Sequence, residues 1–232
     1  MNEHTSKKFD AELEGIRTRV LQMGGMVELQ IVKAMEGLSD GDLLLIDQVI
    51  ENDNRVNLLE IELDEACNQV IAKRQPTAVD LRIVSTVQKT ITDLERIGDE
   101  AKKIAKTAKQ LHSAASPFMP QIRLSHIADA VVDMLRTSLD AYARLDTIAA
   151  AQVVRQDKEV DAEFKGIMRQ LITYMIEDPR MISHAIDLMF VAKSVERIGD
   201  HAKNIAEYVV YMVKGRDVRH TSLEEIEREA TR

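Results

Sequence analysis

The sequence predicts an all-α protein made of two tandem, structurally similar three-helix bundles. The composition suits long packed helices, because the 232 residues include only eight aromatic residues and four prolines while 45% are apolar. Apolar residues recur at spacings of three and four over long stretches, which is the period of an amphipathic helix. The run Glu-Arg-Ile-Gly-Asp occurs twice, at residues 95–99 and 196–200, and this repetition predicts an internal duplication.

The first three helices are predicted at residues 5–38, 42–74 and 77–112. An apolar series from Phe9 to Val27 indicates the first helix, and two glycines between residues 37 and 41 end it. The Gln-Pro-Thr segment at 75–77 separates the second helix from the third. Thr77, with Asp80 three residues later, is typical of a helix N-cap.

The second set of helices is predicted at 120–146, 148–177 and 179–214. A connector with two prolines, at residues 113–120, separates the halves, and Asp178 before Pro179 is typical of the start of a helix. We therefore place the first bundle at residues 1–115, the second at 116–215 and a charged C-terminal tail at 216–232. Within the tail, Ser222 with Glu225 predicts a last short helix.

Composition excludes several classes of function. A net charge of −8 disfavours nucleic-acid binding, which needs clustered Lys and Arg. The N-terminus lacks an apolar signal region and no stretch approaches the roughly 18 apolar residues of a membrane span, so we expect a cytoplasmic protein without direct membrane insertion. No nucleotide-binding glycine loop or His-Glu-x-x-His motif is present. Cys67 lies in an apolar stretch and is interpreted as a buried small side chain.

Two pairs of oxygen-bearing side chains are predicted to meet in each half. In the repeated run the Glu and the Asp are four residues apart and share one helix face. The preceding helix carries a second four-spaced pair, whose first member falls in a slot of the apolar pattern. If the two helices form an antiparallel hairpin, both pairs lie at the same height. The residues are Asp53, Asn57, Glu95 and Asp99 in the first half, and Asp157, Asp161, Glu196 and Asp200 in the second.

Converging carboxylates repel one another unless a cation offsets their charge, and two interpretations remain open at this point. Oxygen ligands favour a metal ion such as Mg²⁺, Mn²⁺, Fe or Zn²⁺. Alternatively, Arg96 and Arg197 fold back and form a salt-bridge network. Asn204 follows Asp200 by four residues and so extends the row formed by Glu196 and Asp200 on one helix face. The corresponding residue of the first half is Lys103, so the two sites need not be equal.

The chain resembles the PhoU family over nearly its whole length, from about Phe9 to Gly215. The resemblance rests on both Glu-Arg-Ile-Gly-Asp runs, on Met-Gly-Gly-Met at 23–26, and on Ala-Lys-Arg-Gln-Pro-Thr-Ala-Val-Asp-Leu-Arg at 72–82. It implies two similar three-helix bundles with a surface metal site on each, built from the eight converging residues. Asn57 reduces the charge of the first site, so we expect the second to bind metal more tightly.

The resemblance also implies a non-enzymatic negative regulator of the phosphate-starvation response and of phosphate uptake. Such a protein acts as an adaptor between the ATPase subunit of a phosphate transporter and a sensor histidine kinase, and it forms a homodimer. The residues alone leave two rivals, a carboxylate-bridged metalloenzyme and a purely structural acid network. Flanking positions without an evident pocket or general base disfavour the enzyme.

Overall fold

The computed structural model describes residues 3–113, 120 and 122–231, and these ranges form seven α-helices and one 3₁₀ turn. The elements are α1 (Glu3–Asp40), α2 (Leu43–Arg74), α3 (Ala78–Ser113), α4 (Ser125–Arg144), α5 (Thr147–Glu177), η1 (Pro179–Met181), α6 (Ile182–Lys214) and α7 (Leu223–Thr231). The six predicted long helices are all present. The largest difference is at α4, which begins five residues later than predicted. The predicted boundary at residues 115–116 lies outside the described residues.

Short polar caps fix where several helices begin. The carboxylate of Asp42 accepts hydrogen bonds from the backbone N–H groups of Leu44 and Leu45, at 2.9 and 3.2 Å, and so starts α2. Asp146 starts α5 in the same way. The predicted cap at Asp178 is confirmed, because its carboxylate accepts from the backbone N–H of Arg180 at 3.0 Å. It opens the 3₁₀ turn, which α6 continues.

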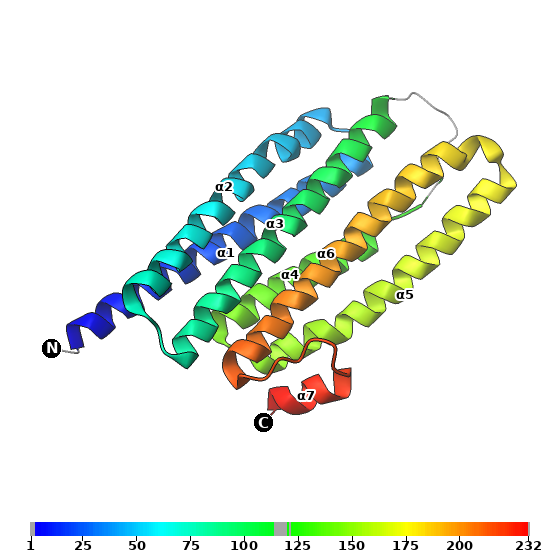
Figure 1. Ribbon diagram of the computed structural model, residues 1–232. Coiled ribbons are helices and arrows are strands. Elements are labelled where there is room, and N and C mark those ends of the chain that lie inside the picture. Colours follow the sequence, from blue (N-terminus) through cyan, green and yellow to red (C-terminus); the bar gives the residue numbers. More distant parts are fainter. Residues whose placement is uncertain (1–2, 114–119, 121, 232) are drawn as a thin grey trace.

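The six long helices form two layers (Figure 1). Helices α2, α3, α6 and α5 lie side by side in one layer, whose outer surface we call the front face, and α1 and α4 lie behind it. Within each half the three helices pack on one another. The halves join where α3 runs antiparallel to α6 and where α1 contacts α4. None of the described helices has a stretch long and apolar enough to cross a bilayer.

Close approach of α1 to α4 depends on Gly24. A Cβ atom at this position would lie 2.5 Å from a methyl carbon of Leu139, so the leucine side chain occupies the space that a larger residue would need. The surrounding core is apolar and includes Cys67, which is buried as predicted. Burial raises the pKa of its thiol to about 12, so it is a packing residue rather than a nucleophile at neutral pH.

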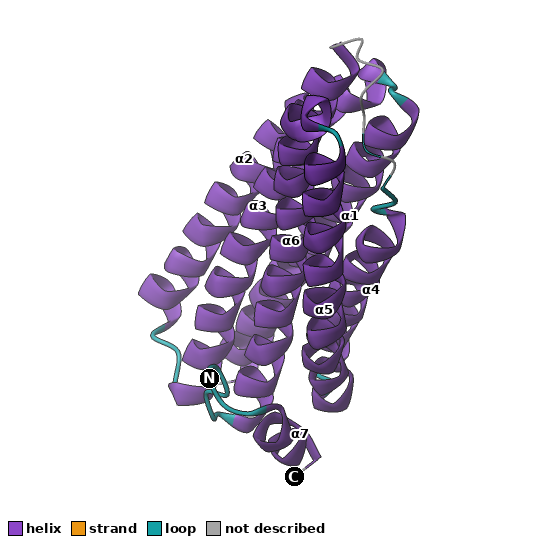
Figure 2. Ribbon diagram, turned by 90° about the vertical axis from the view of Figure 1, so that its right-hand side faces the viewer, coloured by secondary structure: helices purple, strands orange, loops and turns teal. Residues whose placement is uncertain are grey.

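The C-terminal segment folds back onto the second half (Figure 2). Helix α7 packs against α5, and Val218, Ile226 and Ala230 are each at most 3% exposed. The hydroxyl group of Thr147 donates a hydrogen bond to the carbonyl of Ala230 at 2.7 Å. The predicted cap at Ser222 is confirmed, with Glu225 N–H donating to its hydroxyl oxygen at 3.3 Å. The charged tail is therefore a packed element.

Candidate functional site

The first carboxylate cluster lies between α2 and α3. Asp53 of α2 is fully buried, and its Oδ2 atom lies 2.6 Å from the Nζ atom of Lys102 on α3. The side-chain amide of Asn57 donates to the same oxygen at 3.4 Å. Glu95 and Asp99 are partly buried on the α3 side. We call these five residues the first cluster.

Electrostatic effects show that the carboxylates of the first cluster are close together. Burial raises the pKa of Glu95, and the negative charges of Asp99, Glu60 and Asp53 raise it further. The pKa of Lys102 is raised by its hydrogen bond to Asp53, with smaller contributions from Asp99 and Glu95. The structure therefore brings Asp53, Glu95 and Asp99 to one height, as the antiparallel hairpin predicts.

The second cluster repeats this arrangement between α5 and α6. Asp157 is 5% exposed, and its Oδ2 atom lies 2.7 Å from the Nζ atom of Lys203. Burial raises the pKa of Asp200, and the charges of Glu196 and Asp157 raise it further. Glu207 lies one turn beyond Lys203 and is 6% exposed. We call these five residues the second cluster.

Asp161 stands apart from the second cluster. It is partly buried on α5. Within the described parts of the chain, no hydrogen bond or ion pair joins its carboxylate to the other predicted ligands. Glu196 in turn pairs with Lys193, one turn earlier on the same helix. The two predicted ligand pairs of this half are therefore joined through Asp157 and Asp200.

Two lysines supply the positive charge in these clusters, and the sequence interpretation missed both. Lys102 and Lys203 are 101 residues apart, the same separation as the two Glu-Arg-Ile-Gly-Asp runs, so the internal repeat was the signal that could have revealed them. The predicted arginines behave differently. Arg197 lies 3.0 Å from Glu100 on α3, and Arg96 is exposed. Ion pairs do form within the two clusters, but lysines supply the positive charge in place of the predicted arginines.

The glycine of each repeated run allows the helices to pack closely at the height of its cluster. A Cβ atom on Gly98 would lie 3.2 Å from Gln30 Oε1 of α1 and 3.5 Å from Val56 Cγ1 of α2. On Gly199 it would lie 3.3 Å from Val131 Cγ1 of α4 and 3.5 Å from a methyl carbon of α5. The crowding of three helices therefore favours glycine at both positions.

The donor atoms of the first cluster suit a hard cation. Asp53 Oδ1 and Asn57 Oδ1 are buried and have no hydrogen-bond partner among the described residues, so two oxygen acceptors remain unused. In the arrangement seen here, however, no three His, Cys, Asp or Glu side chains of the described ranges surround one point closely enough to hold a metal ion. A metal ion at either cluster therefore stays a prediction.

A buried polar seam joins α3 to α6 between the clusters. His201 Nδ1 lies 2.6 Å from Asp93 Oδ1, and the side-chain amide of Asn204 donates to the same oxygen at 3.2 Å. Asn204 therefore faces the other half of the molecule, whereas the sequence had suggested that it extends the acidic stripe. Lys103 and Arg197 both contact Glu100 within this seam.

Comparisons with known sequences match both halves of the chain. A profile described as the PhoU domain matches residues 20–108 and 124–209, which confirms the predicted duplication. The phosphate-specific transport system accessory protein PhoU of Serratia marcescens is 48% identical over 229 residues, covering 98% of this chain and 93% of that protein. Its Escherichia coli counterpart is 47% identical over 229 residues, covering 98% and 94%.

Solved structures show the same fold. A crystal structure of PhoU from Pseudomonas aeruginosa superimposes with a TM-score of 0.86 at 46% identity, covering 90% of this chain and all of that one. The phosphate transport system regulatory protein PhoU of Streptococcus pneumoniae gives a TM-score of 0.84 at 25% identity, covering 90% and 99%. Both the duplication and the three-helix architecture are thus shared with these proteins.

Proposed function

The chain belongs to the PhoU family, and from this premise we propose that it is an accessory protein of a phosphate-specific transport system. Relatives of this name and of 47–48% identity cover nearly the whole chain, and a similar solved structure is described as a transport system regulatory protein. In this role the chain is a non-enzymatic negative regulator. It restrains phosphate uptake and the phosphate-starvation response when phosphate is sufficient.

The observation that carries this proposal is the pair of carboxylate clusters. Helix α1 covers the back of the α2–α3 pair and α4 covers the back of the α5–α6 pair. Because Glu95, Asp99, Glu196 and Asp200 are only partly buried, we place these acids on the front face. Clustered negative charge attracts cations and basic patches of other proteins. Two similar acidic sites on one face suit an adaptor that contacts more than one partner.

We propose the ATPase subunit of the phosphate transporter and a sensor histidine kinase as those partners, with the chain acting in the cytoplasm as a homodimer. Two observations support a binding role over catalysis. The cavities of about 600 and 130 Å³ found in the described structure are lined by residues outside both clusters. The most buried acids, Asp53 and Asp157, are each paired with a lysine rather than with a histidine that could act as a general base.

We further propose that each cluster exchanges its lysine ammonium for a metal ion. The ligands would be Asp53, Asn57, Glu95 and Asp99 in the first cluster, and Asp157, Glu196 and Asp200 of the second cluster together with Asp161, which lies one turn after Asp157 on α5. Zn, Fe, Mn and Mg are the candidate ions, because oxygen donors dominate both sets. Burial and then repulsion from neighbouring acids raise the pKa values of Glu95 and Asp200, and a bound ion would offset the repulsion.

Gene deletion followed by complementation tests the regulatory role. In cells that lack the gene and grow with ample phosphate, a phosphate-starvation reporter should be active, and restoring the chain should repress it. Continued activity with normal amounts of folded protein would contradict the proposal. Hydrolysis of phosphoesters by the purified protein, abolished by a chelator, would favour a metalloenzyme instead.

Elemental analysis of protein purified without a metal-affinity tag tests the metal sites. The double variant Glu196→Ala, Asp200→Ala should lose metal that the wild-type protein retains. Asp129→Ala, Asp133→Ala is a matched control, because these two acids are also four residues apart but are exposed on α4 in the other layer. Equal, near-zero metal in wild-type and variant proteins would show that the ligand assignment is wrong.

A further inference from the structure

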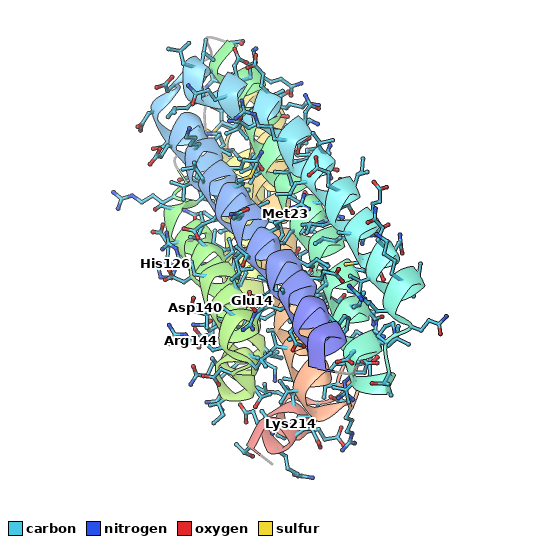
Figure 3. The ribbon with its side chains drawn as sticks, turned by 90° about the vertical axis from the view of Figure 1, so that its left-hand side faces the viewer. Glu14, Met23, His126, Asp140, Arg144 and Lys214 are labelled. Atoms are coloured by element: carbon cyan, nitrogen blue, oxygen red, sulfur yellow. The ribbon has the colours of Figure 1, made fainter. Side chains whose placement is uncertain are left out.

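We infer that a cavity between α1 and α2 is a binding site for a small oxyanion, that is, a compact carboxylate or an anion of the size of phosphate. The cavity has a volume of about 130 Å³. Figure 3 shows α1 and α2 side by side on this face of the molecule. The lining residues are Met26, Leu29, Gln30, Lys33, Val49, Asn52 and Arg55.

One residue that lines the cavity has a buried side-chain amide without a hydrogen-bond partner. Gln30 is only 4% exposed, and neither its Oε1 nor its Nε2 atom has a hydrogen-bond partner among the described residues. A buried polar group without a partner destabilises the folded state. Native structures therefore usually supply a ligand or an ordered water at such a place. The Nε2 group of Gln30 is therefore an unused donor in the lining of the cavity.

The charges around the cavity favour an anion. Lys33 from α1 and Arg55 from α2 both line it, and no Asp or Glu does. Lys33 donates one hydrogen bond, to Gln48 at 3.0 Å, and an ammonium group has three donors. Arg55 is exposed and forms no ion pair with any residue that the structure describes. A cationic lining without carboxylates attracts negative ligands, even on a chain of net charge −8.

Size and polarity narrow the ligand class. Each water molecule takes up about 30 Å³ in the liquid, so the cavity holds a group of roughly four water volumes. A carboxylate or a tetrahedral oxyanion fits this space, and a nucleotide does not. Met26 and Val49 form apolar walls, which strengthen charged hydrogen bonds by excluding water.

The site belongs to the first half alone. By the repeat that relates Asp53 to Asp157, the counterpart of Arg55 is Glu159, which reverses the charge. The residue that faces Gly199, where Gln30 faces Gly98, is the apolar Val131. Neither the cation nor the buried amide is therefore repeated. The duplication preserves the carboxylate clusters but not this cavity.

Calorimetric titration of the full chain with inorganic phosphate and, separately, with acetate tests the inference. The titrations are made at low ionic strength, where charged contacts are least screened. We expect saturable binding of at least one of the two anions at one site per chain. Arg55→Gln should weaken it about tenfold, because charge-assisted hydrogen bonds are about twice as strong as neutral ones. Arg169→Gln removes another exposed arginine, on α5, and should leave binding unchanged.

Binding of phosphate alone would identify a tetrahedral oxyanion site, and binding of acetate alone a carboxylate site. Absence of saturable binding, or equal weakening by Arg55→Gln and Arg169→Gln, would overturn the inference. Lys33→Met provides a second variant, with the same expected loss, and melting followed by circular dichroism shows that each variant is folded. These titrations do not depend on the regulatory role, so the two proposals can fail separately.

Discussion

At the scale of single residues, two ion pairs with the same N–O distance differ in how deeply they are buried. Lys102 with Asp53 and Lys109 with Asp47 are both 2.6 Å apart. The side chain of Asp53 is 0% exposed, whereas both members of the Lys109 pair are 48% exposed. An unpaired buried carboxylate is costly, but an exposed one is solvated by water. Only the first pair should therefore matter for stability.

Lys102→Met should lower the free energy of unfolding by about 2–4 kcal/mol, because it leaves the Asp53 carboxylate buried without its cation. Lys109→Met is the matched control and should change it by less than about 1 kcal/mol. Urea denaturation of both variants measures the difference. Equal effects of the two substitutions would show that the buried pair contributes no more than a surface pair.

A second residue, Glu207, should make stability depend on pH. Burial raises its pKa from 4.5 to about 7, with Lys203 and Arg219 opposing the shift and Asp157 and Asp217 adding to it. The folded chain thus binds more protons than the unfolded chain between these pH values. The stabilising contribution that protonated Glu207 makes is complete below pH 4.5 and is lost as the pH rises through about 7.

Glu207→Gln removes this titration and should therefore stabilise the protein increasingly as the pH rises from 4.5 to 7. The full difference is about 3 kcal/mol, since each unit of pKa corresponds to about 1.4 kcal/mol. Denaturation at several pH values measures it, with the exposed Glu65→Gln as the control. A stability difference that stays constant over this range would contradict the assignment.

Residue patterns predicted the carboxylates better than their partners. Asp53 and Asp157 interrupt an apolar series, which indicated buried acids, and helix geometry then placed Glu95 and Asp200 beside them. The lysines were missed because a lysine on a flanking position looks like any solvated charge until its neighbour is known. Asn204 was misplaced for a different reason, since its partner, Asp93, belongs to the other half.

At the scale of helices, two adjacent glycines of α1 differ in their surroundings. A Cβ atom on Gly24 would overlap the buried side chain of Leu139, whereas a Cβ atom on Gly25 would meet nothing within 4 Å. Neither glycine has a positive φ angle, so alanine fits both backbones. The first glycine serves helix packing, and the second only lowers helix propensity.

Gly25→Ala should therefore raise the free energy of unfolding by about 0.5–1 kcal/mol. Gly24→Ala should lower it by about 1–3 kcal/mol, since the added methyl group overpacks the contact between α1 and α4. Thermal unfolding followed by circular dichroism compares the two. Stabilisation by both substitutions would mean that α4 moves away from α1 at little cost.

Helix positions were largely predictable because Pro, Gly and Asp mark most of their ends. The Asp178–Pro179 signal is an example, since the same carboxylate that suggested a cap makes the capping hydrogen bond. The start of α4 was not predictable, because Pro120 suggested an earlier start than Ser125. The packing of α7 was missed as well, because a charged composition hides the few apolar residues that anchor it.

At the scale of the whole molecule, the contact between α3 and α6 determines how the two clusters are presented. It makes one layer of the four helices that carry them and leaves α1 and α4 behind (Figure 1). Asp93 with His201 and Glu100 with Arg197 cross this contact. The duplication predicted two bundles, but their relative placement depends on pairings between distant residues, which helical periodicity does not encode.

A phosphate-starvation reporter tests most directly whether the two acidic clusters carry the regulatory function. The measurement uses cells grown with ample phosphate, in which one of two variants replaces the chain. The cluster variant combines four substitutions, Glu95→Ala, Asp99→Ala, Glu196→Ala and Asp200→Ala. The control combines Asp129→Ala and Asp133→Ala. Both proteins must be folded and present in normal amounts. We predict an active reporter with the cluster variant and a repressed one with the control. Full repression by the cluster variant would contradict the claim.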